Sequence, residues 1–360
     1  MKRALLPPLA LWLLLAGGCS ALPTAREMGD MALLRTMGVD REGGEMAVTA
    51  STGPRARGLQ GEGLPALVLS TRGDTLSGAC MAMQGLSDSY VFFGYVDQLL
   101  VGEEAARAGL RPVLNYFAQD VELGLGAQLW LVRGGTAQAA VSSGGDQGVE
   151  GRLSTLRTDG ELGVASVART AGEVYTDLME QGSAFVPALV LSGEEEPALL
   201  EQGYGVLIGD RLVGYLDGSA ARGLELLASR ACAEMVEVPG AEGRVAVRVT
   251  GSHTVGTLSF QGERPLQLRL TCRVECQLEE APAELSDREL EEVRRDLERR
   301  CRSWLEGALE QLQDWGADCI GLGLRAAASH PGRWGAIERD WPRWFGRVEI
   351  EVEVQVDVHA

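Results

Sequence analysis

One amphipathic stretch near the end of the chain constrains the fold most. From Leu290 to Trp315, apolar residues recur at spacings of three and four, which predicts a helix of about thirty residues, roughly 45 Å long. Ser286 and Glu289 fit a capping box, so we expect the helix to begin at Ser286. Its other face is dense in Glu and Arg. We predict that this helix lies across a sheet, the alternative being a coiled-coil partner face.

The end of the chain predicts part of that sheet. Apolar residues from Val348 to Val358 alternate strictly with Glu349, Glu351, Glu353, Gln355 and Asp357. This pattern is typical of a strand with one buried and one acidic face. The acidic face would repel a second copy and so protect a sheet edge. Similar alternation predicts an antiparallel sheet with one solvated face over residues 244–250, 254–260 and 266–278.

The rest of the chain mixes strand and helix signals without a repeat, which predicts an α+β fold of two to three mixed-sheet domains. We expect strands at 33–39, 45–50, 67–69, 91–101, 128–132 and 188–191, and a hairpin over 203–216. Helices are expected at 75–84, 102–109, 110–120, 134–141, 174–181 and 219–231, with 141–166 a weak element or loop. The polar stretch at 193–197 suggests a boundary between domains 19–195 and 196–360.

The first residues indicate an exported, lipid-anchored protein. Lys2 and Arg3 precede an apolar run over 5–15, and small residues then lead to Cys19. The run is shorter than the roughly 20 residues that a membrane-spanning helix needs. We therefore predict that residues 1–18 are a cleaved lipoprotein signal peptide and that Cys19 is the lipidation site, its acyl chains holding the protein on a membrane. The alternative is an ordinary secreted protein in which this cysteine occurs by chance.

The net charge and the cysteine spacing exclude several classes of protein and of metal site. A net charge of -18 argues against nucleic acid and against binding to anionic lipid through a basic patch. Cys272 and Cys276 would lie about 13 Å apart on one strand face, too far to bond to each other or to share a zinc ion. A disulfide from either one to Cys232 stays open. The pairing cannot be deduced for the set Cys80, Cys232, Cys272, Cys276, Cys301 and Cys319.

The sequence carries no signature of catalysis. The three histidines lie away from cysteines and from each other, and neither a phosphate-binding loop nor a serine-hydrolase elbow occurs. Residues 321–326 resemble a truncated dinucleotide fingerprint, but they follow a helix and not a strand. We predict a protein that is not an enzyme and that needs neither a metal nor a cofactor.

Four stretches together resemble the Ger(x)C family, the lipoprotein C subunits of nutrient germinant receptors in spore-forming bacteria. They are Arg26-Glu27 with 37–40, 94–120, 203–218, and 317–323 with His330, Pro331, Trp334, Asp340, Trp341 and Phe345. Three positions depart from the usual pattern: Ser20 replaces a tryptophan, Tyr95 a histidine and Gln119 an arginine.

The resemblance implies several α/β domains with mixed sheets and a non-catalytic role. It places the protein on the outer face of the spore inner membrane, beside two membrane-spanning subunits of A and B type. Such assemblies sense amino acids, sugars or nucleosides and start germination. A solute-binding lipoprotein that delivers a nutrient to a transporter is the alternative, and a wall hydrolase is a third hypothesis.

The matched residues also have structural interpretations. We expect the glycines at 203, 214 and 218 to serve turns or close backbone approach. Trp334, Trp341 and Phe345 are expected in a core, and Tyr204 and Tyr215 are expected to pack together across the hairpin. Arg26, Glu27 and Asp40 are the polar candidates for function, with a turn or a salt bridge as the alternative role.

Overall fold

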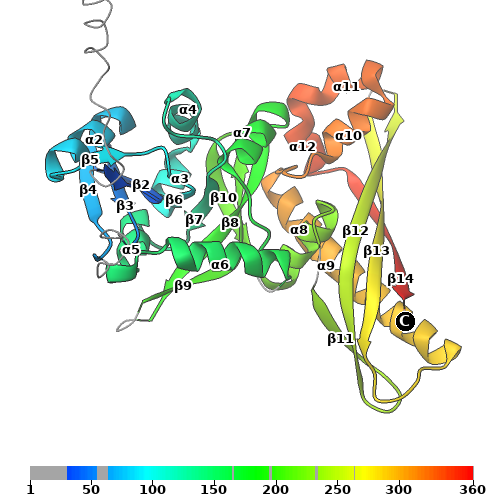
Figure 1. Cartoon of the computed structure of the whole chain (residues 1–360). Coiled ribbons are helices and arrows are strands. Elements are labelled where there is room, and N and C mark those ends of the chain that lie inside the picture. The colour runs from blue at the N-terminus through cyan, green and yellow to red at the C-terminus, as the bar shows by residue number, and fades with distance from the viewer. Residues whose placement is uncertain are drawn as a thin grey trace, which may run out of the picture.

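The computed structural model describes residues 31–54, 64–163, 166–193, 197–231, 234–262 and 264–359. Predictions about Cys19, Arg26, Glu27 and Cys232 therefore fall outside the described residues. The fold is α+β, as predicted, and its two sheet-bearing halves stand side by side in Figure 1.

The first half is built on an eight-stranded mixed sheet of order β10-β9-β8-β7-β6-β2-β3-β4. Its four middle strands run parallel, and the strands at each end are added antiparallel. A parallel pair, β1 with β5, lies apart from this sheet. The strands are β1 (Met31–Leu33), β2 (Thr36–Glu42), β3 (Glu45–Ser51), β4 (Val68–Gly73), β5 (Tyr90–Phe92), β6 (Gln98–Gly102), β7 (Gln128–Val132), β8 (Ser183–Ser192), β9 (Ala198–Ile208) and β10 (Arg211–Leu216).

Helices cover both faces of this sheet because its central strands are apolar on both faces. Leu99 and Leu129 point into a core shared with α2, α3, α4 and α7, whereas Leu100 and Trp130 point into a second core under α5 and α6. The helices are α2 (Leu76–Met83), α3 (Glu103–Ala108), α4 (Arg111–Gln119), α5 (Ala137–Ser142), α6 (Glu150–Glu161) and α7 (Ala171–Glu180), with short 3₁₀ turns at Gln84–Leu86 and Gly145–Gln147.

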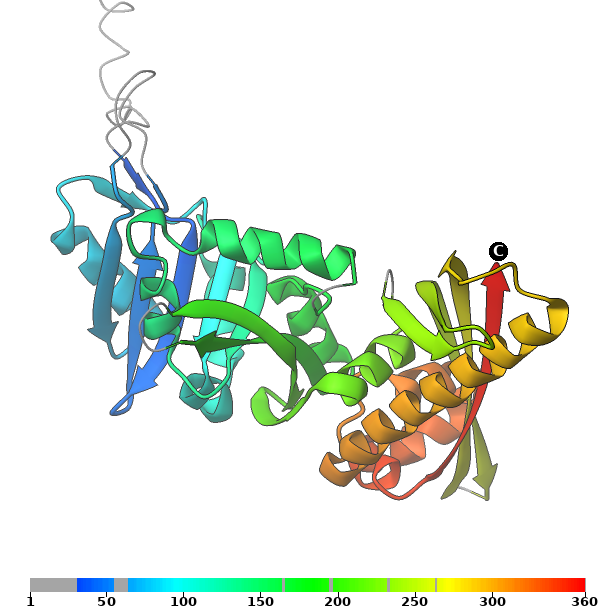
Figure 2. The same ribbon diagram turned by 90° about the horizontal axis from the view of Figure 1, so that it is seen from below.

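The second half is a four-stranded sheet with one long helix laid across it, as predicted (Figure 2). Three strands are antiparallel and β14 is added parallel to β13 at the edge. The strands are β11 (Met235–Pro239), β12 (Arg244–Gln261), β13 (Arg264–Glu280) and β14 (Glu349–His359). The helices are α8 (Gly218–Leu227), α9 (Asp287–Trp315), α10 (Leu322–Ser329), α11 (Pro331–Ile337) and α12 (Trp341–Phe345), with a 3₁₀ turn at Glu338–Asp340.

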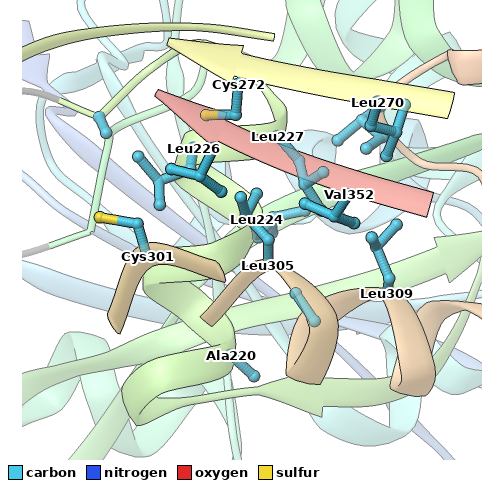
Figure 3. Close-up of a cluster of buried hydrophobic side chains, with 14 of the residues drawn as sticks. Ala220, Leu224, Leu226, Leu227, Leu270, Cys272, Cys301, Leu305, Leu309 and Val352 are labelled. Atoms are coloured by element: carbon cyan, nitrogen blue, oxygen red, sulfur yellow. The ribbon is translucent and has the colours of Figure 1, made fainter. Parts of the chain in front are cut away.

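Helix α9 begins and ends where its sequence predicts. The Ser286 N–H donates to Glu289 at 2.8 Å, and the Glu289 N–H donates back to the Ser286 hydroxyl, which completes the capping box. Gly316 ends the helix in the left-handed region with φ 70°. Figure 3 shows Cys301, Leu305 and Leu309 of α9 packed toward Leu224 of α8 and Val352 of β14. Each buried leucine contributes about 1.5–3 kcal/mol to folding.

Several element predictions were wrong. Residues 91–101 form two strands, β5 and β6, because the chain turns between Phe93 and Val96, where the Val96 N–H donates to the Phe93 carbonyl at 3.0 Å. The stretch 141–166, expected as a weak element or loop, contains the twelve-residue helix α6. The two strands expected at 244–250 and 254–260 are one continuous strand, β12, which passes a register shift near Gly251.

Strands β8, β9 and β10 of the large sheet contribute side chains to the cores of both halves. On β9, Tyr204 and Val206 point into the core of the second half, whereas Leu207 points into the core of the first. The boundary proposed between residues 195 and 196 falls between β8 and β9, which pair antiparallel with each other. Side chains on opposite faces of one strand therefore pack into the cores of different halves.

Candidate functional site

Several residues of the matched stretches make contacts between distant parts of the chain. Within the first half, α3 and α4 contact the β9–β10 turn. The Asp210 carbonyl accepts from the Leu110 N–H at 2.7 Å, and its carboxylate accepts from the Arg111 N–H at 3.1 Å. Gly109 has φ 131°, and a Cβ there would lie 2.7 Å from the Asp210 carboxylate. This close approach needs a glycine.

Glu103 is the centre of the same contact. Its carboxylate accepts from Arg107 at 2.7 Å, from the Gly134 N–H at 2.6 Å and from the Tyr215 hydroxyl at 3.2 Å. Burial raises the pKa of Glu103, but the hydrogen bonds from Gly134 and Arg107 outweigh it, and the pKa lies below its usual value. Arg133 covers the Tyr215 ring at 4.7 Å from its centroid. Helix α3 is thereby held against β10 by charged hydrogen bonds.

A buried polar cluster lies on the opposite face of β9. The Tyr204 hydroxyl donates to Glu225 of α8 at 2.7 Å and accepts from the Val167 N–H at 2.7 Å. Arg222 pairs with Glu225 at 3.0 Å and with Glu234 at 3.1 Å. Two carboxylates thus share one guanidinium, in a place that is largely closed to water.

This environment changes the proton affinity of both carboxylates. Burial raises the pKa of Glu225, although Arg222 and Tyr204 oppose the shift. Burial also raises the pKa of Glu234 to about 7, against the attraction of Arg222. The cluster gives no nucleophile and no acid–base pair beside an open cavity, and its contacts join β9 to α8.

The prediction that Tyr204 and Tyr215 pack together across the hairpin was wrong. In the β9–β10 ladder, Tyr204 pairs with Leu216 and Tyr215 pairs with Gly205. Neighbouring residues of a strand point to opposite faces. The two rings therefore serve different contacts, Tyr204 with the second half and Tyr215 with α3.

Glycines allow close packing where α9 meets the large sheet and where α9 meets α8. Gly214 of β10 lies against the Trp315 ring, and Gly223 of α8 lies against the Trp304 carbonyl, with no room for a Cβ at either position. Between the two halves, Gln181 donates to the Cys319 carbonyl at 3.2 Å. The expectation that Gly214 serves a close approach is confirmed.

Asp318 organises the end of α9 and the start of α10. Fully buried, it accepts from the Leu322 N–H at 2.8 Å, the Gly323 N–H at 2.6 Å and the Trp341 indole at 2.8 Å. Burial raises its pKa, and these bonds oppose the rise. Trp341 and Phe345 are buried and Trp334 packs against them, which confirms the predicted core role.

Asp40 has a structural role. Its two carboxylate oxygens accept from the Ala137 and Gln138 N–H groups, each at 2.8 Å, at the start of α5. Burial raises the pKa of Asp40, and both backbone bonds oppose this. The residue lies in strand β2, and the turn follows at Gly43. Asp40 therefore satisfies the free N–H groups of a helix start.

The described cysteines are buried free thiols. Cys272 and Cys276 lie on the inner face of β13, opposite Cys301 of α9, which confirms that the first two are separate thiols. Cys80 and Cys319 are buried elsewhere.

Among the open surface hollows that the described residues line, two have similar volumes. One, of about 430 Å³, is lined by Arg41, Asp74, Asn115 and Tyr116 among others. The other, of about 450 Å³, lies over the middle of β12 beside Ser229, His253 and Arg325. Among the described residues, no cluster of His, Cys, Asp and Glu is arranged to hold a metal ion. Within the same ranges, no helix combines the length and the apolarity that a membrane span requires.

Two family models match the chain in order. Residues 24–191 match the spore germination protein N-terminal domain, and residues 202–360 match the spore germination B3/GerAC-like C-terminal domain. The chain belongs to the Ger(x)C family. Membership implies a role in spore germination, and the family comprises receptor subunits associated with the spore membrane.

A solved structure shows the same fold. The crystal structure of the GerBC protein superposes with a TM-score of 0.61 over 91% of this chain and 97% of that chain, at 15% sequence identity. A search of curated proteins found no match.

Sequence reasoning missed the buried cluster of Arg222, Glu225 and Glu234. The chain has 51 acidic residues, and no spacing or motif distinguishes Glu225 and Glu234 from the others or marks Arg222 as their partner. Tyr204 was singled out, but its partner lies 21 residues away on another element.

Proposed function

We propose that this chain is a non-catalytic, lipid-anchored C subunit of a nutrient germinant receptor, with Cys19 as the lipidation site. It acts on the outer face of the spore inner membrane through contacts with membrane-spanning A and B type subunits. The ordered match of both family domains, over residues 24–191 and 202–360, carries the proposal. The buried contacts of Tyr204, Glu225 and Asp318 support it, because these polar side chains are satisfied by packing within the chain.

Germination of spores that lack this gene tests the proposal. We expect loss of the response to one group of nutrients, and recovery when the wild-type gene is restored. An unchanged response to every nutrient, in spores that lack any sister receptor, would contradict it.

One observation favours the alternative of a solute-binding lipoprotein. The hollow beside Arg41 and Asp74 sets a cation and a carboxylate on the rim of a space of about 430 Å³, a size typical of small-molecule sites. Calorimetry of the isolated protein with amino acids and nucleosides separates the two functions. Micromolar binding that Arg41→Ala abolishes would favour the solute-binding protein, and no heat of binding would favour the receptor subunit.

A further inference from the structure

Strand β14 forms one edge of the four-stranded sheet, and its backbone shows which groups face outward. It pairs with β13 in parallel from Glu349 to His359 (Figure 2). The Val356 N–H donates to the Glu298 side chain of α9 at 3.5 Å, so we infer that it points toward the edge away from β13. Because the backbone groups of alternate residues point to the same side of a strand, those of Ile350, Val352 and Val354 also face the free edge.

Side chains of α9 occupy both ends of this edge. Gln313 donates to the Val348 carbonyl at 2.9 Å, and Glu298 accepts from the Val356 N–H. Between these contacts, the edge-facing groups of Ile350, Val352 and Val354 have no hydrogen-bond partner within the part of the chain that the structure describes. A row of open donors and acceptors of this kind is a template for another strand.

The carboxylates beside these unpaired backbone groups favour a basic partner segment. Glu349, Glu351, Glu353 and Asp357 are exposed on the outer face of β14. Arg269 of β13 pairs with Glu351 at 2.9 Å. Arg273 is a further cation of β13 on this face, and Glu349, Glu353 and Asp357 outnumber it. Side chains directly opposite each other on neighbouring strands share a face. An added strand would therefore place its outward residues against carboxylates.

We propose that β14 accepts an extended segment of a partner protein in which basic residues alternate with apolar ones. The segment continues the sheet beyond Ile350–Val354, with its basic side chains opposite Glu349, Glu351 and Glu353. A second copy of this chain is disfavoured as the occupant, because like charges would then lie opposite each other. This inference goes beyond the proposed function and does not depend on it, since the isolated chain tests it without spores.

The test uses a capped, fluorescent peptide of alternating lysine and valine and the full chain. The control peptide has the same composition with lysines and valines in two blocks, and equals the first in charge. We expect the alternating peptide to bind at least about tenfold more tightly, because only it can pair along the edge. Hydrogen exchange should show that it protects the amides of Ile350, Val352 and Val354.

Two variants separate strand addition from general attraction between opposite charges. Val354→Pro removes one edge donor and leaves the ladder with β13 intact, since proline is tolerated where its nitrogen faces solvent. Glu349→Gln with Glu353→Gln removes two charges from the row. Both are expected to weaken binding of the alternating peptide roughly tenfold, whereas Glu306→Gln with Glu310→Gln on exposed α9 should leave it unchanged.

Three results would overturn the inference. They are equal binding of both peptides, binding without protection of the three amides, and dimers of the chain that Val354→Pro dissociates. If the proline variant fails to fold, the glutamine variants and the exchange measurement still decide.

Discussion

The Tyr204 hydroxyl lies 2.7 Å from the Glu225 carboxylate and donates to it, joining β9 of the large sheet to α8 of the second half. Tyr204→Phe keeps the ring and removes the donor and the acceptor for the Val167 N–H. We expect the free energy of unfolding to fall by about 1–3 kcal/mol, because buried polar groups lose their partners. Urea denaturation measures this change in the free energy of unfolding. Tyr95→Phe, at a side chain that is 46% exposed, should change stability little.

The burial of Glu234 predicts that the stability of the fold depends on pH. The pKa of Glu234 is about 7 in the folded chain against an ordinary 4.5. Its stabilising contribution is thus fully present below about pH 4.5 and is lost as pH rises through 7. Glu234→Gln stays neutral, so we expect it to gain up to about 3 kcal/mol relative to wild type between about pH 5 and pH 8.

Unfolding free energies across this pH range check the prediction. Glu237→Gln removes an exposed partner of Arg244 and serves as the matched control. A constant difference between wild type and Glu234→Gln at every pH would show that Glu234 does not titrate in this way.

Close packing at Gly214 predicts a coupled pair of substitutions. Gly214→Ala places a methyl group into the Trp315 ring, and overpacking of this kind costs about 1–3 kcal/mol. Trp315→Leu in the same chain should recover part of that loss, because the two positions share one space. Gly307→Ala, with open space around it in the middle of α9, should instead stabilise by about 0.5–1 kcal/mol. Additive effects at 214 and 315 would contradict the contact.

The burial of the cysteine thiols predicts that they are alkylated slowly in the folded chain. Burial raises the pKa of Cys301 and Cys276 to about 12 and that of Cys80 to about 11. Because the thiolate is the reactive form, iodoacetamide at neutral pH should leave these three unmodified in the folded chain and modify them in urea. Peptide mass spectrometry reads out each position. Rapid labelling of Cys301 in the native chain would show that α9 detaches from its sheet.

Much of this fold could be predicted because its signals are local. The helix at 287–315 has its capping box, its periodicity and its terminal glycine within its own residues. Helix α6 was missed because its buried residues are sparse, namely Leu153, Leu156 and Gly160. Two glycines and polar residues mask its period.

The side-chain contacts of the candidate site could be predicted less well, because they join residues that are far apart in the sequence. Asp40 was singled out as polar, but its partners at the start of α5 lie 97 and 98 positions away. The opposite facing of Tyr204 and Tyr215 depends on the register between β9 and β10, which shifts between Leu212 and Gly214. A one-residue change of register reverses which face a side chain occupies.

One measurement follows both lipid anchoring and the nutrient response in the same spores. Spores that carry Cys19→Ala as the sole copy are compared with Ser20→Ala, which keeps the thiol. We expect the Cys19→Ala protein to leave the membrane fraction and nutrient-triggered germination to weaken, with Ser20→Ala like wild type. Full membrane retention and a normal response in Cys19→Ala spores would contradict both lipid anchoring at Cys19 and its role in germination.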